Sequence, residues 1–270
     1  MRRAASLDHV GVVGRNLDVL AEAFEAVGFR LTPFARHAGG RTGNRCAMLR
    51  GSYIELMAIL PGGTSATLER FLGRHAGAHI LGFGIADEVA ALARLRRALP
   101  SVPDPVATER LADEADPEGP RARFLTLIPP DRPEGRYVLV RHLTPDALWQ
   151  NRYLQHPNRA ETLAEAIIVA PEPAGVAAAL SCLAGWPVVP DPSGGYALPL
   201  PVGCVRVLPE GEPLGLPHTP EAPCIAALTI ITQDKNQALR RLLGDHGIPH
   251  VNRGDAVLVE AGGVALRFVG

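Results

Sequence analysis

The chain has 270 residues, of which 47% are hydrophobic and 20% are charged; these proportions are typical of a folded protein and exclude a wholly disordered or fibrous chain. Its formal net charge is −1 and no Lys/Arg block stands out, so we expect neither nucleic acid nor a membrane surface as a partner. Length alone allows either one large domain or two of ordinary size.

The N-terminal segment and the cysteines favour a cytoplasmic location. Residues 1–3 are basic but no apolar signal core follows them, and no apolar run is long enough to span a membrane. The four cysteines lack any CxxC spacing, which argues against a zinc knuckle and against a disulfide framework; they are Cys46, Cys182, Cys204 and Cys224. We expect reduced, mostly buried thiols.

The first 60 residues read as one strand, one helix and three further strands. Residues 7–13 predict a strand, and a helix follows with Asn16 as its N-cap and Gly28 at its C-terminus. Three short apolar or β-branched segments come next, separated by Gly or Pro: GFRLTPF, RCAMLRG and SYIELMAIL.

The same order returns three more times along the chain. The second copy begins at HILGFGI and has Asp87 as helix N-cap, the third begins at LAEAIIVA, and the fourth begins at CIAALTII with Asp234 as cap. The alternative is ordinary β/α alternation with a parallel sheet, but here each helix is followed by about three strands. The repeat therefore predicts an α+β protein built from tandem βαβββ modules.

A polar, aromatic-bearing segment separates the second and third copies. We predict a first half at 1–148, with modules at 7–60 and 78–145, a connector at 149–162, and a degenerate second half at 163–270. The sequence leaves open whether the first module pairs with the second or the fourth.

Two ionisable residues of the first module stand on strands at positions that suit a site. A glutamate at position 55, inside an apolar strand, is costly if it is buried without a partner. His9 on the first strand and Glu55 on the fourth form either a pair of metal ligands or an acid/base pair.

Several segments resemble the glyoxalase-like members of the vicinal-oxygen-chelate superfamily. LDHVGVVGRNLDVLAEAF, TGNR and SYIELMAI are similar to the first module, and RYVLVRHLTPDALWQNRYLQHPN is similar to the junction of the tandem members. The resemblance implies cupped mixed sheets around a small oxygenated organic molecule, with isomerase, lyase or dioxygenase activity. The alternative is a metal-free binding or sequestering protein of the bleomycin-resistance type.

The resemblance also implies a His on the first strand and a Glu on the last strand of each module, which two modules pool around one divalent ion such as Zn, Fe, Mn or Ni. By this analogy His9 and Glu55 are catalytic residues and ligands, joined by His79 or His142. Arg141 stands where the second carboxylate would be, and a guanidinium cannot ligate a metal. The metal-free alternative is a Glu55–Arg141 ion pair beside a carboxylate- or carbonyl-bearing ligand.

Five residues are predicted to contact the ligand: Arg141, Asn44, Tyr53, His142 and Trp149. Trp149 lies in the connector, where it either covers the mouth of the cup or packs the two halves together. His37 lies in a loop and is expected to be a solvated surface histidine. The partners that we predict are a small molecule and, as an alternative to a monomer, a second copy of the chain.

In the second half, Glu165 stands where His9 stands in the first, and Arg206 and Arg267 occupy the closing strands. This pattern predicts either an internal Glu–Arg pair or two solvated arginines on edge strands.

Overall fold

The structure is a computed structural model that describes residues 6–211 and 220–270, and the predicted βαβββ module occurs in it four times. The first module comprises β1 (Ser6–Val13), α1 (Leu17–Ala26), β2 (Ala35–Arg36), β3 (Thr42–Leu49) and β4 (Ser52–Ile59). The second comprises β5 (Gly77–Gly84), α3 (Glu88–Ala98), β6 (Val106–Leu111), β7 (Arg121–Leu127) and β8 (Arg136–His142). An additional helix that the sequence analysis did not predict, α2 (Ala66–Arg74), joins them.

The second half repeats the pattern after two short 3-10 helices, η1 (Pro145–Ala147) and η2 (Asn151–Tyr153). The third module comprises β9 (Ala160–Val169), α4 (Pro173–Ala184), β10 (Val189–Pro190), β11 (Tyr196–Pro199) and β12 (Cys204–Leu208). The fourth comprises β13 (Cys224–Thr232), α5 (Gln237–Asp245), β14 (His250–Arg253), β15 (Ala256–Ala261) and β16 (Val264–Val269).

Most of the predicted helix starts agree with the capping contacts. The side chains of Asn16 and Asp87 accept hydrogen bonds from backbone N–H groups of the first turns of α1 and α3. The third prediction is off by two residues, because the N-cap position of α5 is Asn236. Asp234 still accepts a hydrogen bond, 2.8 Å long, from the backbone N–H of Ala238.

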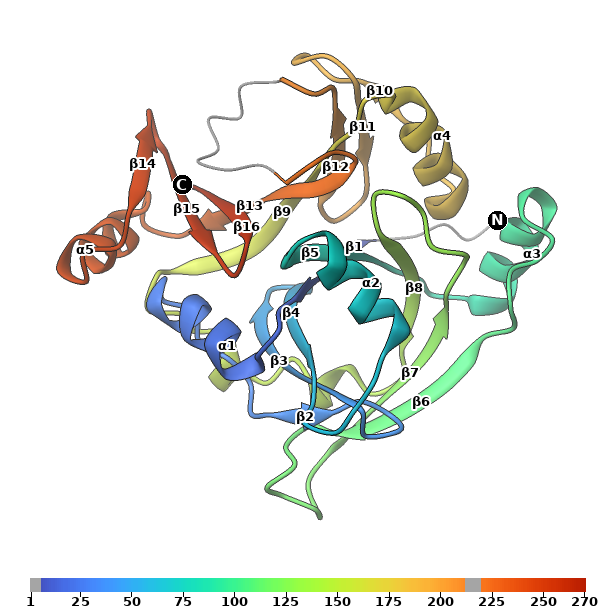
Figure 1. Ribbon diagram of the computed structural model, residues 1–270, viewed down its shortest axis with the longest axis horizontal. Coiled ribbons are helices and arrows are strands. Elements are labelled where there is room, and N and C mark those ends of the chain that lie inside the picture. Colours follow the sequence, from blue (N-terminus) through green and yellow to red (C-terminus); the bar gives the residue numbers. More distant parts are fainter. Residues whose placement is uncertain (1–5, 212–219) are drawn as a thin grey trace.

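Each half forms one eight-stranded mixed sheet, with strand orders β2-β3-β4-β1-β5-β8-β7-β6 and β10-β11-β12-β9-β13-β16-β15-β14. Within the first, β1 pairs parallel with β4 and antiparallel with β5. The first module therefore pairs with the second, which the sequence had left open. Figure 1 shows the two curled sheets, with the first seen nearly end-on as a ring.

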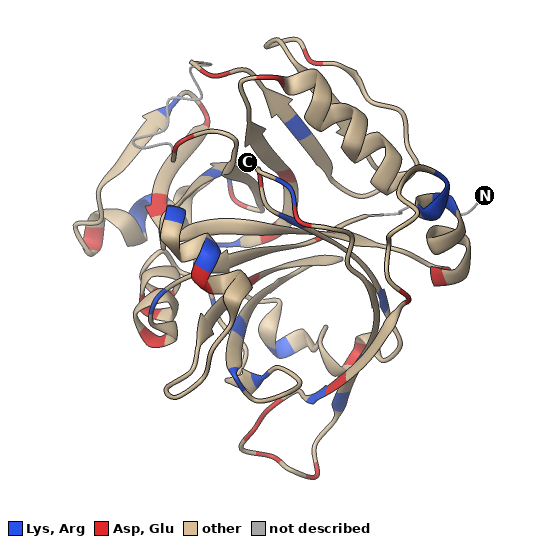
Figure 2. Ribbon diagram, turned by 45° about the vertical axis from the view of Figure 1, so that its right-hand side comes forward, with Lys and Arg blue, Asp and Glu red and all other residues tan. Residues whose placement is uncertain are grey.

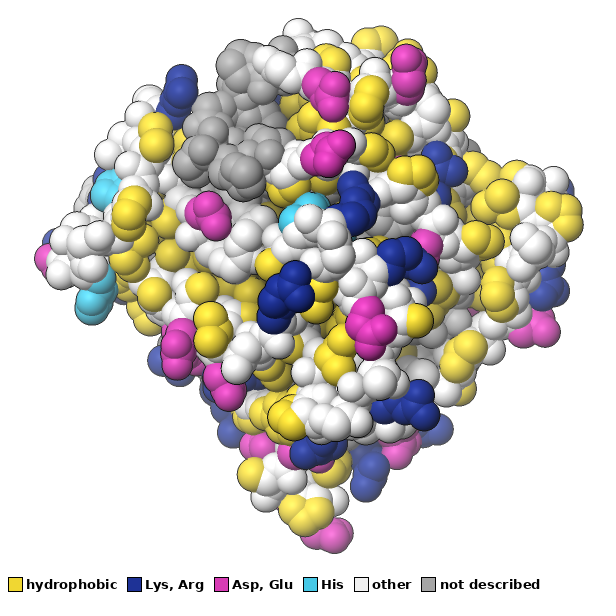
Figure 3. All heavy atoms as spheres, viewed as in Figure 1, with side chains coloured by type: hydrophobic (Ala, Val, Ile, Leu, Met, Phe, Trp, Pro, Cys, Tyr) yellow, Lys and Arg dark blue, Asp and Glu magenta, His cyan; other side chains and the backbone are white. Residues whose placement is uncertain are grey.

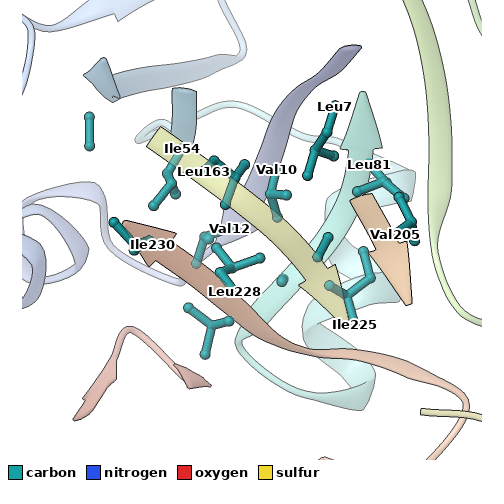
Figure 4. Close-up of a cluster of buried hydrophobic side chains, with 14 of the residues drawn as sticks. Leu7, Val10, Val12, Ile54, Leu81, Leu163, Val205, Ile225, Leu228 and Ile230 are labelled. Atoms are coloured by element: carbon teal, nitrogen blue, oxygen red, sulfur yellow. The ribbon is translucent and has the colours of Figure 1, made fainter. Parts of the chain in front are cut away.

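The two sheets share one hydrophobic core. Val10 and Ile54 of the first sheet and Leu163 and Leu228 of the second are at most 2% exposed and belong to the same cluster, which Figure 4 shows between the strands. Because side chains alternate along a strand, burying Val10 on this face turns its neighbour His9 to the other, concave face.

The first sheet curls until its two edge regions meet. The backbone N–H of Glu114, after β6, donates to the carbonyl of Phe34, just before β2, at 3.3 Å. The Glu114 carboxylate accepts a hydrogen bond from the Arg36 backbone at 3.1 Å. The sheet is thus nearly closed into a barrel around its concave side.

Charged side chains are interspersed on the surface. Figure 2 shows Lys/Arg and Asp/Glu residues of both signs on both halves, and in Figure 3 basic and acidic side chains lie close together over α2 and its surroundings. Among the described residues, no helix combines the length and the apolar character needed to cross a membrane.

Candidate active site in the cup of the first half

A cavity of about 420 Å³ lies inside the first sheet and is lined by residues of both modules and of α2. Its apolar wall includes Met57, Leu68, Ile80, Val138 and Val140. Its polar residues include His9, His37, Thr42, Glu55 and Arg110. An apolar wall with a few polar groups is the usual lining of a small-molecule site.

A β-bulge positions His9. The register between β1 and β5 shifts between Leu7 and His9, so Asp8 is an extra residue in the ladder. The bulge brings two consecutive side chains together, with the Asp8 carboxylate 2.9 Å from His9 Nδ1. Gly82 faces His9 across the ladder, and a Cβ on this glycine would lie 2.2 Å from the imidazole. The absence of a side chain there gives His9 its space.

Asp8 bridges two imidazoles. His142 Nε2 lies 3.0 and 3.1 Å from the two Asp8 oxygens. Burial would raise the pKa of Asp8, but the hydrogen bonds from His142 and His9 outweigh it and the pKa lies below its ordinary value. The predicted ligand-contacting residue His142 therefore touches Asp8, and it is not part of the cavity lining.

His9 is buried, and the carboxylates of Asp8 and Glu55 act on it. Burial would lower the pKa of His9, but the hydrogen bond to Asp8 and the charges of Asp8 and Glu55 outweigh it, and the pKa is raised. With Nδ1–H donated to Asp8, the remaining nitrogen is Nε2, which has no hydrogen-bond partner among the described residues. His9 lines the cavity, so Nε2 is the nitrogen that is left for a bound molecule.

Aromatic rings pack against this histidine. Tyr53 stacks on His9 with ring centroids 4.9 Å apart and lines the cavity. Trp149 meets Tyr53 and His142 edge to face, and its indole N–H donates to the Leu49 carbonyl at 3.0 Å. Trp149 is thus placed behind the two rings, and it is not among the residues that line the cavity.

Glu55 lies on the same concave face as His9, because it pairs with Gly11 on the neighbouring parallel strand. The structure therefore brings the two predicted catalytic residues into one cavity. The Glu55 carboxylate is 3.2 Å from His37 Nε2 and accepts a hydrogen bond from the Asn44 amide. Burial would raise the pKa of Glu55, but the hydrogen bond and charge of His37, with smaller contributions from His9 and Arg110, bring it down to about 2.

The prediction for His37 was wrong. Its side chain lines the cavity, where it bonds to Glu55 and lies 2.9 Å from Thr42 Oγ1. The β2–β3 hairpin explains this position, because the His37 backbone N–H donates to the Thr42 carbonyl across the turn. Counting outward from the Gly-Gly turn at 39–40 would have placed His37 opposite Thr42.

Two further predictions were wrong because the side chains face away from the cavity. Arg141 alternates with Val140 on β8 and binds Glu88 of α3, with Nη1 2.7 Å from the carboxylate. The proposed Glu55–Arg141 pair therefore does not exist. His79 stacks on Phe71 of α2 at 4.8 Å and cannot join His9, while its neighbour Ile80 lines the cavity instead.

The second half contains the predicted internal pair. Glu165 accepts a hydrogen bond from Thr229 at 2.7 Å and lies 4.0 Å from Arg267. Arg206 forms a two-point contact with Asp191, at 2.7 and 2.8 Å. The alternative of solvated edge arginines was wrong, because β12 and β16 are interior strands.

A family profile described as a glyoxalase-like domain matches residues 7–184, about two thirds of the chain. The chain belongs to the glyoxalase-like family. No curated protein sequence matches it. The glyoxalase-like assignment agrees with the tandem cupped sheets and confirms the resemblance to the vicinal-oxygen-chelate superfamily.

Solved structures share the fold over nearly the whole chain. A hypothetical protein from Staphylococcus aureus has a TM-score of 0.70 at 13% identity, covering 97% of each chain. A mutant of 4-hydroxymandelate synthase from Streptomyces coelicolor has a TM-score of 0.65 at 12% identity, covering 98% of this chain and 92% of that one. The Mn(II)-bound glyoxalase from Novosphingobium aromaticivorans has a TM-score of 0.59 at 11% identity, covering 99% and 82%. At these identities the likeness concerns the fold alone.

The residues of this glyoxalase-like cup do not fit a divalent metal ion. In the ladder of β1 and β5, His9 faces Gly82 and Ile80 faces Gly11, so the two modules are related by a local twofold that exchanges His9 with Ile80. The same symmetry relates Glu55, which pairs with Gly11, to an apolar position on β8.

That apolar position is Val138, which pairs with Gly82. Two of the four symmetry-related positions therefore hold aliphatic side chains, whereas an open metal site needs about three protein ligands. In the described part of the chain, no group of three or more His, Cys, Asp or Glu side chains is arranged to hold a metal.

Proposed function

We propose that this glyoxalase-like protein is an enzyme that transfers a proton on a small oxygenated organic molecule bound in the cup of the first half. His9 is the group that takes and returns the proton. The observation that carries this proposal is that Asp8 holds His9 by Nδ1 at a cavity wall, which leaves Nε2 for the bound molecule. A carboxylate behind an imidazole sets its orientation and stabilises its protonated form.

The acidities favour His9 over Glu55 as the base. A general base works best when its pKa lies near the operating pH, and the pKa of His9 is raised from 6.5. The pKa of Glu55 is about 2, so this carboxylate is a weak base. We assign Glu55 a supporting role, in which its charge stabilises His9 when His9 carries the proton.

Among the activities implied by the family resemblance, proton transfer supports an isomerase or a lyase better than a dioxygenase. Both of the former classes need a base beside an acidic C–H or O–H bond, which His9 supplies. A dioxygenase of this family would need a metal ion, and the side chains of this cavity do not provide a third metal ligand.

The proposed proton transfer can be tested by measuring the exchange of substrate protons with solvent. Purified protein is incubated in D₂O with a panel of 2-oxo acids, 2-hydroxy acids and aldehydes, and deuterium uptake next to the oxygenated carbon is measured by proton NMR. We expect at least one compound to exchange, and His9→Asn to slow this exchange by about 100-fold or more. Trp186, a half-buried residue of the other half, can be replaced by Phe as a control that keeps exchange unchanged.

The second candidate is a metal-free binding protein. It is favoured by the polar groups of the cavity that already satisfy one another, such as Glu55 with His37. Saturable binding of panel compounds without deuterium uptake would favour this candidate and contradict the enzyme. Deuterium uptake that survives His9→Asn would contradict the role of His9 as the base.

A further inference from the structure

Arg110 reaches into the cavity from β6. It pairs with the buried Ala122 of β7 and lines the same cavity as His9 and Glu55. Its guanidinium carbon lies 5.9 Å from the centroid of the Phe124 ring, and its Nη1 donates to the Leu111 carbonyl at 3.2 Å. The Leu111 carbonyl and the nearby Cys46 thiol still leave several of the five N–H donors of the guanidinium available.

The charges of the other cavity residues are already paired. Arg136, the second arginine of the lining, is held by Asp131 with contacts of 2.7 and 3.1 Å. Glu55 is bonded to His37 and Asn44. Asp8, next to the cavity, is shared by two histidines.

Arg110 differs from these residues. Across residues 6–211 and 220–270, no carboxylate lies within 4.0 Å of its guanidinium. Glu109, its neighbour along β6, contacts Arg121 and Arg123, each at 3.3 Å. The guanidinium therefore carries a charge into the cavity without a hydrogen-bonded carboxylate, and the Glu55 charge interacts with it only from beyond 4.0 Å, although a charge taken out of water is normally paired at closer range.

We infer that Arg110 binds a carboxylate of the substrate, so that the natural ligand of this cup is a small organic acid with an apolar body. A guanidinium matches a carboxylate with two parallel hydrogen bonds. The apolar body of such an acid would contact Phe124 and the aliphatic wall. This inference rests on the proposed function in taking the same cavity as the substrate site, but it concerns binding and needs no turnover.

The test uses matched pairs of acid and amide that differ only in charge: benzoate and benzamide, phenylacetate and phenylacetamide, 3-phenylpropionate and 3-phenylpropionamide. Binding to the full chain is measured by isothermal titration calorimetry at constant ionic strength. We expect at least one acid to bind about tenfold or more tightly than its amide, since a hydrogen-bonded charge pair contributes that much or more.

Variants of Arg110 test whether this side chain causes the preference for the acid over the amide. Arg110→Met should weaken acid binding about tenfold and leave amide binding unchanged, and Arg110→Lys should retain part of the preference. Arg141→Met is the matched control, because Arg141 faces away from the cavity and binds Glu88; its acid binding should equal that of the wild type. Circular dichroism and thermal melts establish that each variant is folded.

Three results would overturn the inference: equal affinity of the wild type for acid and amide, unchanged acid binding in Arg110→Met, or no saturable binding of any of the three acids at millimolar concentration. His9→Asn separates this inference from the proposed function, because it should abolish exchange but keep the acid preference. Loss of exchange activity alone would therefore leave the role of Arg110 standing.

Discussion

The Asp8 carboxylate lies 2.9 Å from Nδ1 of His9, although the two residues are consecutive in a strand. Consecutive side chains of a regular strand point to opposite faces, and the bulge at Asp8 is what permits the contact. The same carboxylate also binds His142 of β8. One bulged residue thus couples the first strand of one module to the last strand of the other.

Asp8→Asn tests this coupling. The amide cannot stabilise a protonated imidazole as a carboxylate does, so the pKa of His9, which Asp8 raises, should fall. We expect an NMR titration of the His9 ring to show a lower pKa, and proton exchange on any active compound to slow about tenfold or more.

Asp104→Asn is the control for Asp8→Asn, because Asp104 forms an exposed pair with Arg96 and should leave the His9 titration unchanged. If the pKa of His9 is the same in Asp8→Asn and in the wild type, Asp8 does not act on His9.

The low pKa of Glu55 predicts that the stability of the protein depends on pH. The pKa of this carboxyl falls from an ordinary 4.5 to about 2 on folding, so its ionised form stabilises the native state. This contribution is complete above about pH 4.5 and is lost as the pH falls through about 2. The shift corresponds to at most roughly 3 kcal/mol in the free energy of unfolding.

Glu55→Gln should therefore be less stable than the wild type at pH 7, and the two should converge as the pH approaches 2. Urea unfolding followed by circular dichroism at a series of pH values measures the difference. Glu22→Gln, at an exposed position of α1, is the control and should follow the wild-type curve. A difference between Glu55→Gln and the wild type that is constant with pH would contradict the low pKa.

Gly82→Ala tests the space reserved for the imidazole. A Cβ at this position would lie 2.2 Å from His9, so either the ring or the backbone must move. We expect a loss of about 1–3 kcal/mol in the free energy of unfolding and altered NMR signals of the His9 ring. Gly73→Ala in α2 is the matched control, because no atom lies within 4 Å of a Cβ built there, and alanine favours a helix. Equal stability of Gly82→Ala and the wild type would show that the ring has room to spare.

The repeated fold was predictable because helix caps and strand alternation are local signals. Asn16 and Asp87 cap their helices as expected, and strand spacing placed His9 and Glu55 in one cavity. The error at Arg141 arose because the position that corresponds to Glu55 is Val138, three residues earlier, and an odd shift moves a side chain to the opposite face of a sheet.

Non-local features limited the rest of the site prediction. The bulge at Asp8 depends on how β1 pairs with β5, and no residue of β1 signals it. Arg110 enters the cup because the sheet curls until β6 approaches β2, which no local pattern encodes. The helix α2 was missed although Ser65 caps it and Glu69 bonds back to the Ser65 backbone, a pattern similar to a capping box.

The local twofold of the first half makes a prediction about metal binding. His9 and Glu55 correspond to Ile80 and Val138, so the double substitution Ile80→His with Val138→Glu would present four potential ligands to one space. Calorimetric titration with Mn²⁺ and Zn²⁺ should show about 100-fold or more tighter binding by the double variant than by the wild type, since three or more ligands define an open site.

The wild-type chain is the control for the double variant. We expect the wild type to show the same melting temperature with and without a chelator, and no stoichiometric divalent ion by plasma mass spectrometry after reconstitution. Adding His9→Ala to the double variant should remove the gained affinity, which establishes where the metal binds. One tightly bound metal per wild-type chain that is lost on His9→Ala would contradict the assignment, because the aliphatic positions would then not prevent a metal site.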